Sequence, residues 1–153
     1  MITVFWIIIA AVVWCYILVF IKIEGLKKYW SVVIWSLLLA YFINDTFVSS
    51  GLYLFQDIYY PFQGLPLAYL ISSAGKGIII IRYLPEERWW QLFYLILFAI
   101  VITAIEFFAF EGGYLVFLQW SLSLSLTFRL IAYITLAWLS MLTVREKKSY
   151  LYR

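Results

Sequence analysis

The chain has 153 residues, of which 67% are hydrophobic, 22% are aromatic and only 12% are charged. A soluble domain carries about a quarter charged residues, so this composition excludes an ordinary water-exposed surface. The sequence has 1 cysteine and no histidine, which excludes an internal disulfide and removes the residue on which many zinc and haem sites depend. We therefore expect a single all-α transmembrane domain over residues 1–153, a helical bundle with no cofactor and no metal site.

Five apolar runs are long enough to cross a bilayer, which takes about 20 residues per helix. They cover approximately residues 3–21, 30–50, 65–84, 89–110 and 114–144. As a straight helix the last run would be roughly 46 Å long, so it must tilt, kink or project beyond the bilayer. The segment Gly51–Gly64 mixes aromatic, polar and turn-forming residues, which favours an interfacial loop or a short helix at the level of the lipid headgroups.

The basic residues predict the orientation of this bundle. Of the 11 Lys and Arg residues, all but Lys76 and Arg129 flank the first connection, the third connection or the C-terminus. These flanking residues are Lys22, Lys27, Lys28, Arg82, Arg88, Arg145, Lys147, Lys148 and Arg153. The positive-inside rule then predicts a multi-pass plasma-membrane protein with its N-terminus outside and its C-terminus in the cytoplasm. This distribution argues against nucleic acid as a partner and leaves membrane lipids, a membrane protein partner or a second copy of the chain.

Ionisable side chains inside the spans are the first candidates for a functional site. Each costs at least about 2.5–3.5 kcal/mol at the centre of a bilayer, so it usually faces the bundle interior and has a partner. At ~1.5 Å per residue, Asp45 and Glu106 share a level in the outer third, Lys76 lies near the middle and Arg129 lies in the middle or inner half. Two ion pairs are plausible at these depths, Asp45 with Lys76 and Glu106 with Arg129. The alternative is one proton shared by the two acids.

Helical spacing adds uncharged polar residues to this set. In the fifth span Ser121, Ser125 and Arg129 recur every four residues, and a second row contains Gln119, Ser123 and Thr127, which together predict a broad polar face. The candidates for an intramembrane polar site are therefore Asp45, Glu106, Lys76, Arg129, Asn44, Gln119 and Ser125. Two interpretations stay open. These groups are either hydrogen bonds and ion pairs that hold helices together, or the lining of a polar cavity that opens to the outside.

The sequence has no phosphate-binding glycine loop, no nucleophile elbow and no cluster of metal ligands. The leading hypothesis is therefore a non-enzymatic structural or partner-binding membrane bundle. The alternative is a small transport or proton-coupled subunit whose polar cavity involves Asp45, Glu106, Lys76 and Arg129. A third hypothesis is a lipid-modifying enzyme that uses Asp45 and Glu106 as acid and base.

Several short motifs are found in the same order in one family. They are Phe42-Ile43-Asn44-Asp45-Thr46, Val48-Ser49-Ser50, Tyr60-Pro61-Phe62, Leu65-Pro66, Ile105-Glu106-Phe107 and Trp120. Over roughly residues 40–137 the chain resembles a family of small multi-span membrane proteins, with no assigned reaction, from spore-forming Bacillota. The resemblance implies a plasma or forespore membrane and a role in the envelope or in sporulation. The chain departs from the family pattern around Gly75-Lys76-Gly77, where relatives are more uniformly apolar.

Overall fold

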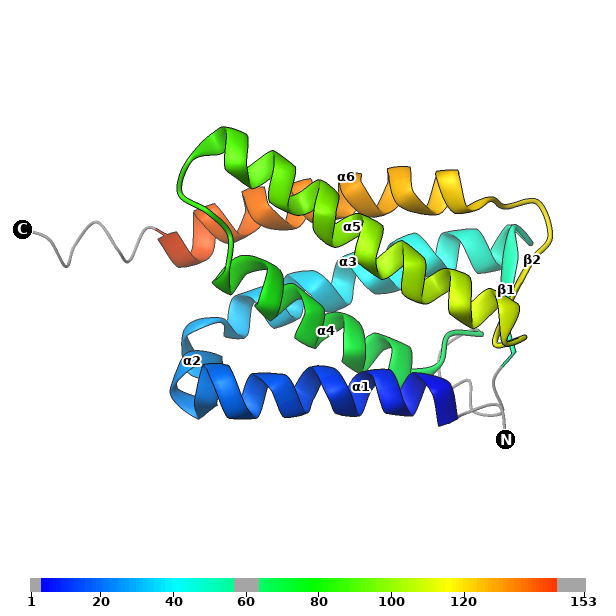
Figure 1. The fold of residues 1–153 in the computed structure, drawn as a ribbon, viewed down its shortest axis with the longest axis horizontal. Helices are drawn as coiled ribbons and strands as arrows, with labels where there is room; N and C mark the ends of the chain where they lie inside the picture. The colour runs from blue at the N-terminus through cyan, green and yellow to red at the C-terminus, as the bar shows by residue number, and fades with distance from the viewer. Residues whose placement is uncertain (1–3, 57–63, 146–153) are drawn as a thin grey trace, which may run out of the picture.

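The computed structural model describes residues 4–56 and 64–145 and shows the expected all-α architecture (Figure 1). The helices, in chain order, are α1 (Val4–Tyr16), α2 (Lys22–Lys28), α3 (Trp30–Ser49), α4 (Leu67–Arg82), α5 (Arg88–Glu111) and α6 (Leu122–Ser140). A π-helical turn, Ile17–Ile21, joins α1 to α2, and a second one, Met141–Arg145, continues α6. Two short strands, β1 (Tyr53–Phe55) and β2 (Leu115–Phe117), complete the described elements.

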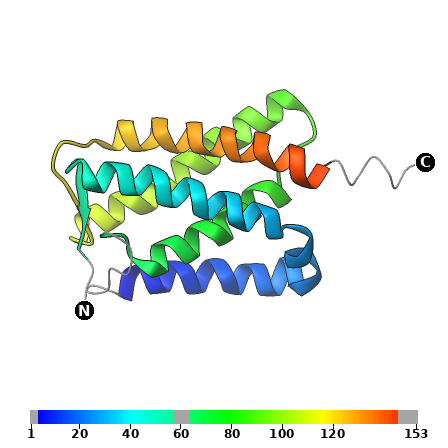
Figure 2. The ribbon, with the colours of Figure 1, turned by 180° about the vertical axis from the view of Figure 1, so that it is seen from behind.

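The long helices α1, α3, α4, α5 and α6 all run between the same two ends of the molecule (Figures 1 and 2). One end contains the strand pair and the start of α1. The other end contains α2, the connection from α4 to α5 and the end of α6. Each successive long helix reverses direction, which is the arrangement expected when short connections join neighbouring helices of a bundle.

Four helical segments are long and apolar enough to cross a membrane: Val4–Ile21, Trp30–Ser49, Arg88–Glu111 and Leu122–Val144. Large apolar side chains such as Phe20, Phe93 and Trp138 are exposed on the outside of these segments, a surface that lipid accepts and water does not. The composition and these segments together support a helical membrane bundle.

The α4 helix occupies the middle of the bundle, where it packs against α1, α3 and α6. It has 16 residues and is therefore about 24 Å long, shorter than the roughly 30 Å of a bilayer core. Two glycines allow its close packing. A Cβ at Gly75 would collide with Val13 of α1, and a Cβ at Gly77 would collide with Ser36 of α3. Both neighbouring helices thus rest directly against the backbone of α4.

The predicted fifth span is wrong in its first part. Residues 114–144 do not form one helix, because Leu115–Phe117 is a strand that pairs antiparallel with Tyr53–Phe55. Aromatic and β-branched residues favour such pairing, and the partner strand is remote in the sequence, so apolar length alone suggested a helix. Ser121 then starts α6, since its side chain accepts a hydrogen bond from the Leu124 backbone N–H at 3.3 Å.

The other predicted spans agree with observed helices to within a few residues. The segment predicted as an interfacial loop or short helix begins with a glycine turn at Gly51 (φ 69°) and continues into β1. The motif Tyr60-Pro61-Phe62 lies outside the described residues, and so do the basic residues Lys147, Lys148 and Arg153.

Candidate functional site

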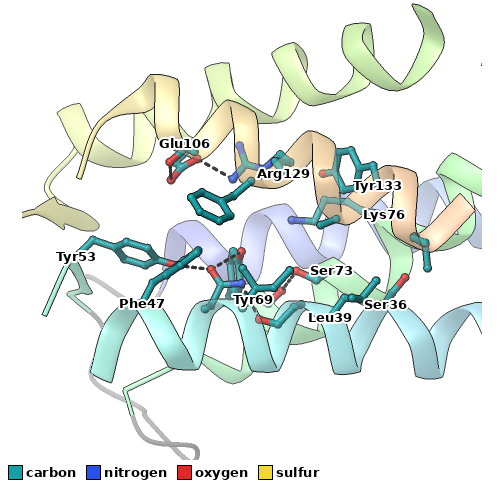
Figure 3. A pocket seen from close by; sticks show the side chains of 18 of the residues that line it. Ser36, Leu39, Phe47, Tyr53, Tyr69, Ser73, Lys76, Glu106, Arg129 and Tyr133 are labelled. Carbon is teal, nitrogen blue, oxygen red and sulfur yellow. Dashed lines mark hydrogen bonds and ion pairs between the residues drawn. The ribbon is translucent and has the colours of Figure 1, made fainter. Parts of the chain in front are cut away.

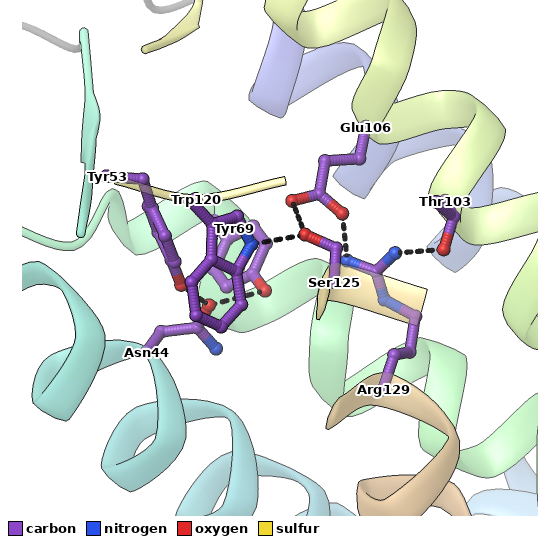
Figure 4. Close-up of polar contacts among 8 residues, drawn as sticks. All are labelled: Asn44, Tyr53, Tyr69, Thr103, Glu106, Trp120, Ser125 and Arg129. Atoms are coloured by element: carbon purple, nitrogen blue, oxygen red, sulfur yellow. Dashed lines mark hydrogen bonds and ion pairs between the residues drawn. The ribbon is translucent and has the colours of Figure 1, made fainter. Parts of the chain in front are cut away.

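An ion pair between Glu106 of α5 and Arg129 of α6 forms the centre of a buried polar cluster (Figure 4). Arg129 Nη2 lies 2.6 Å from Glu106 Oε2, and Arg129 Nη1 donates a hydrogen bond of 2.8 Å to Thr103 Oγ1. The other carboxylate oxygen, Oε1, accepts a hydrogen bond of 2.9 Å from Ser125 Oγ. Trp120 Nε1 in turn donates to Ser125 Oγ at 2.5 Å. Both oxygens of the glutamate are therefore occupied.

Helical periodicity explains why these side chains meet. Thr103 and Glu106 are three residues apart on α5, and Ser125 and Arg129 are four residues apart on α6, so each pair lies on one face of its helix. The two faces pack against each other across the interface between α5 and α6. Of the two ion pairs predicted from depth, the structure thus contains the one between Glu106 and Arg129.

Asn44 of α3 links two further elements to this region (Figure 4). The hydroxyls of Tyr53 in β1 and Tyr69 in α4 both donate hydrogen bonds to Asn44 Oδ1, the second at 3.1 Å. Asn44 Nδ2 donates to the Ala40 carbonyl oxygen at 2.6 Å. The side-chain oxygen of Asn44 therefore has both of its acceptor positions filled.

Lys76 differs from the other charged residues of the cluster. It lies on α4 between the two glycines, and its side chain is only 8% exposed. Its ammonium lies 5.1 Å from the centroid of the Tyr69 ring, which is a cation–π contact. Within the described part of the chain, no carboxylate pairs with Lys76 and no hydrogen bond to its ammonium is found. Its charge is thus buried without a counter-ion.

A cavity of about 100 Å³ lies next to these groups, between α3, α4 and α6. Figure 3 shows the Lys76 ammonium and the Arg129 guanidinium at this cavity, with Ser36, Ser73, Tyr69 and Tyr133 around them. A water molecule needs roughly 10–15 Å³ measured in this way, so the space holds several waters or a small polar group. Ser36 Oγ is buried and has no hydrogen-bond partner among the described residues.

The structure divides the residues predicted for the site. Asn44, Lys76, Glu106, Ser125 and Arg129 all line the cavity. Two predicted residues, Asp45 and Gln119, do not line it.

Asp45 points away from the cavity although its neighbour Asn44 points into it, because successive residues of a helix are about 100° apart. No ion pair joins Asp45 to Lys76 in the described part of the molecule, and Asp45 Oδ1 is buried without a hydrogen-bond partner there. The shared-proton alternative also disagrees with the geometry, since Glu106 lines the cavity and Asp45 does not, and Asp45 Oδ1 has no hydrogen bond to Glu106.

Gln119 precedes α6 and is exposed. Ser123 and Thr127, which were assigned to the same polar row, are exposed as well. The row that contains Ser125 and Arg129 faces the cavity, so the polar face of this helix is narrower than predicted.

The cavity also contains residues that the sequence analysis did not propose. Tyr69 is seven residues before Lys76, and Tyr133 is four residues after Arg129, so helical spacing from a known charged residue could have found both. Ser36 is eight residues before Asn44 and lies on the same helical face. Tyr53 gives no such signal, because its position depends on the pairing of β1 with β2.

The described residues contain no group of three or more His, Cys, Asp or Glu side chains that could hold a metal ion. No protein-family model, no curated protein and no solved structure matches this chain. The resemblance to membrane proteins of spore-forming Bacillota therefore stays a prediction, and the function has to be inferred from the cavity and its charges.

Proposed function

We propose that this chain is a five-span plasma-membrane protein that binds a small polar molecule in its intramembrane cavity without transforming it chemically. Four segments are long and apolar enough to span a membrane, and α4, although shorter, runs alongside them between the same two ends. A tilted neighbour or a thinner local bilayer accommodates a helix of about 24 Å. The polar cavity is then surrounded by helices that face lipid.

The distribution of basic side chains supports an orientation with the N-terminus outside. Lys22, Lys27, Lys28, Arg82 and Arg88 lie at the end that contains α2 and the connection from α4 to α5 (Figure 1). The described residues of the opposite end, around β1 and β2, include no Lys or Arg. By the positive-inside rule, the strand pair faces outward and α2 faces the cytoplasm.

One observation supports binding over a purely structural role, and this is the unpaired ammonium of Lys76. Glu106 and Arg129 form an ion pair with each other, so a structural role as a link between α5 and α6 is sufficient to explain both residues. Lys76 contributes no such link, because no described carboxylate lies within ion-pair distance of it. A buried charge without a partner destabilises a protein unless something else binds it. The adjoining cavity provides the space for that ligand.

The same contacts argue against acid–base catalysis in this cavity. Glu106 is its only carboxylate among the described lining residues, and both of its oxygens are already engaged. No second carboxylate and no histidine lines the cavity among the described residues to complete an acid–base pair with Glu106. Ligand binding is therefore the activity that this geometry supports best.

A cavity-filling variant tests the proposal. Ala132→Phe places a ring into the cavity from α6, whereas Ala104→Phe makes the same change on an exposed position of α5 and serves as the control. Protein extracted in a mild detergent is examined by native mass spectrometry for a bound non-protein mass. We expect the bound mass on the wild type and on Ala104→Phe, and its loss from Ala132→Phe. Wild-type protein without any bound mass, or equal binding in all three proteins, would contradict the proposal.

The orientation is tested separately by cysteine labelling in intact cells, on a Cys15→Ser background. Glu111→Cys lies at the end near β2 and Glu87→Cys at the end near α2, and both positions are exposed. Each change removes one acidic residue, so the two variants are matched. A membrane-impermeant maleimide is expected to label Glu111→Cys and to spare Glu87→Cys before the cells are opened. The reverse pattern would invert the orientation.

A further inference from the structure

We propose that the ligand of the cavity is a phosphate group, carried by a lipid that enters sideways between α3 and α6, with Lys76 as its main binding residue. This inference rests on the proposed binding function and specifies the chemistry of its ligand. It follows from the charge of the cavity, from the hydrogen-bonding groups that line it and from its apolar lining.

The charges that line the cavity do not balance. Arg129 and Glu106 neutralise each other through their contact of 2.6 Å, which leaves the ammonium of Lys76. The described lining residues include no second carboxylate, and Asp45 lies elsewhere on α3. With Lys76 protonated, the described lining has a net charge of about +1 in a medium of low dielectric constant, where an opposite charge is strongly attracted. An anion restores neutrality, and a cation or a neutral solute does not.

The hydrogen-bonding groups of the lining also match an anion. Lys76 has three N–H donors and no ion-pair partner among the described residues, and Ser36 Oγ is buried without a hydrogen-bond partner there. The Tyr133 hydroxyl also lines the cavity, and no hydrogen bond joins it to another residue that the structure describes. These three side chains come from α4, α3 and α6, so they surround the space from three helices.

The acceptors of the lining, in contrast, are already used. Asn44 Oδ1 accepts from two tyrosines, and both oxygens of Glu106 are bonded. A ligand in this cavity thus meets the N–H donors of Lys76 and two hydroxyl groups that can donate, whereas the carboxylate and amide oxygens already accept hydrogen bonds. A phosphate group consists mainly of acceptor oxygens, and it is the group that clustered Lys and hydroxyl donors ordinarily bind.

The shape of the site favours a lipid over a free ion. At the outer end the rings of Phe47 and Trp120 pack with centroids 4.6 Å apart, and Tyr53 lies 5.6 Å from Trp120, so aromatic side chains close this route to water. The lining from α3 and α6 includes the apolar, partly exposed residues Ile43 and Ala132, and the rings of Phe47 and Phe128 pack between these two helices with centroids 4.8 Å apart. An acyl chain fits against such a border, whereas a hydrated ion does not.

The depth of Lys76 in the bundle is consistent with entry of a lipid from the membrane. Lys76 is six residues from Arg82 at the basic end of α4, which corresponds to about 9 Å along the helix. A lipid of the adjacent leaflet needs to sink by this distance for its phosphate to reach the ammonium. The long lysine side chain, which Figure 3 shows extended along the cavity, shortens that path.

The test measures binding to lipid-stripped protein in detergent by native mass spectrometry and by the shift of the unfolding temperature. The probes are phosphatidic acid, diacylglycerol with the same acyl chains and no phosphate, and inorganic phosphate. We expect phosphatidic acid to bind the wild type more tightly than diacylglycerol. Lys76→Met is expected to weaken this binding by about tenfold or more, the effect of losing a charge-assisted hydrogen bond. Lys27→Met, which removes an exposed basic residue at the end of the bundle, is the matched control and leaves binding unchanged.

Tyr133→Phe keeps the charge and almost the full volume of the site, so it tests the same cavity if Lys76→Met fails to fold. It is expected to weaken phosphatidic acid binding a few-fold, as the loss of one neutral hydrogen bond does. Binding of inorganic phosphate that depends on Lys76 and competes with phosphatidic acid would support the phosphate site and assign its source to the free ion. Equal binding of the two lipids, or binding insensitive to both variants, would overturn the phosphate assignment. The proposed function fails separately, if Ala132→Phe does not displace the bound mass.

Discussion

Removal of the Arg129 side chain should destabilise the bundle through the carboxylate that it leaves behind. In the Arg129→Met variant Glu106 keeps Ser125 as its hydrogen-bond partner and loses its counter-ion. Because Glu106 is only 9% exposed, its carboxylate is left without a counter-ion in a largely desolvated site. Thr103 also loses the hydrogen bond of 2.8 Å that Arg129 Nη1 donates to it.

The size of the effect follows from these contacts. Breaking a buried ion pair by removing one partner typically costs about 3–5 kcal/mol, because a buried charge remains uncompensated. Glu106→Gln should cost a similar amount, about 3–5 kcal/mol, because it leaves the buried guanidinium of Arg129 without a counter-ion although the amide oxygen still accepts a hydrogen bond. In the double variant neither charge is left alone. The unfolding free energy lost in the double variant should therefore be about 1–3 kcal/mol smaller than the sum of the two single losses.

Reversible unfolding in mixed detergent and dodecyl sulfate micelles, followed by far-ultraviolet circular dichroism, measures these free energies. Thr127→Val serves as the control, because Thr127 is two residues from Arg129 on the exposed side of α6 and its hydroxyl donates a hydrogen bond within its own helix at 2.9 Å. This variant should change stability by less than about 0.5 kcal/mol. Single losses that add within about 0.5 kcal/mol in the double variant would refute the coupling between Glu106 and Arg129.

Three further predictions concern the central helix and its neighbours. Lys76→Met should raise the unfolding free energy of lipid-stripped protein by about 1–3 kcal/mol, because it removes a buried unpaired charge; a loss of stability would contradict this reading. Gly77→Ala should lower the unfolding free energy by about 1–3 kcal/mol through overpacking, since the new Cβ would lie 2.8 Å from Ser36 Cβ. Adding Ser36→Gly to this variant should recover part of the loss. Asn44→Leu should lower the unfolding free energy by about 1–3 kcal/mol, because two tyrosine hydroxyls lose their shared acceptor. In that background Tyr53→Phe should cost almost nothing more. If Tyr53→Phe costs the same in the wild type and in Asn44→Leu, the shared hydrogen bond is excluded. Unfolding in mixed micelles measures all three.

Part of the site can be read from the sequence because charge is so costly in an apolar run. The composition requires an apolar environment, and within it every ionisable residue needs a partner inside the bundle. Thr103 and Ser125 lie at helical spacing from Glu106 and Arg129, so this ion pair was a plausible prediction, although a proton shared by Asp45 and Glu106 stayed open beside it. The predicted depth of Arg129 was wrong, because it was counted along a helix from Tyr114 and α6 begins at Leu122.

The choice between equivalent rows of residues could not be predicted in this way. On the fifth span the row of Ser125 and the row of Gln119 have the same period, and Asn44 and Asp45 are neighbours on the same helix. Which of them faces inward depends on the rotation of each helix about its axis. That rotation is set by the packing of α6 against α5 and of α3 against the glycines of α4, which are contacts between residues far apart in the chain.

The sequence by itself therefore determined the apolar bundle, the approximate helix boundaries and the charged residues that need partners. The tertiary structure decided that Lys76 has no carboxylate partner among the described residues and that a cavity adjoins it. It also decided that part of the last apolar run is a strand, because backbone groups of Leu115–Phe117 pair with those of Tyr53–Phe55. The physical reason is the same in each case: hydropathy and helical period are local properties, whereas counter-ions, cavities and strand pairs depend on distant segments that fold together.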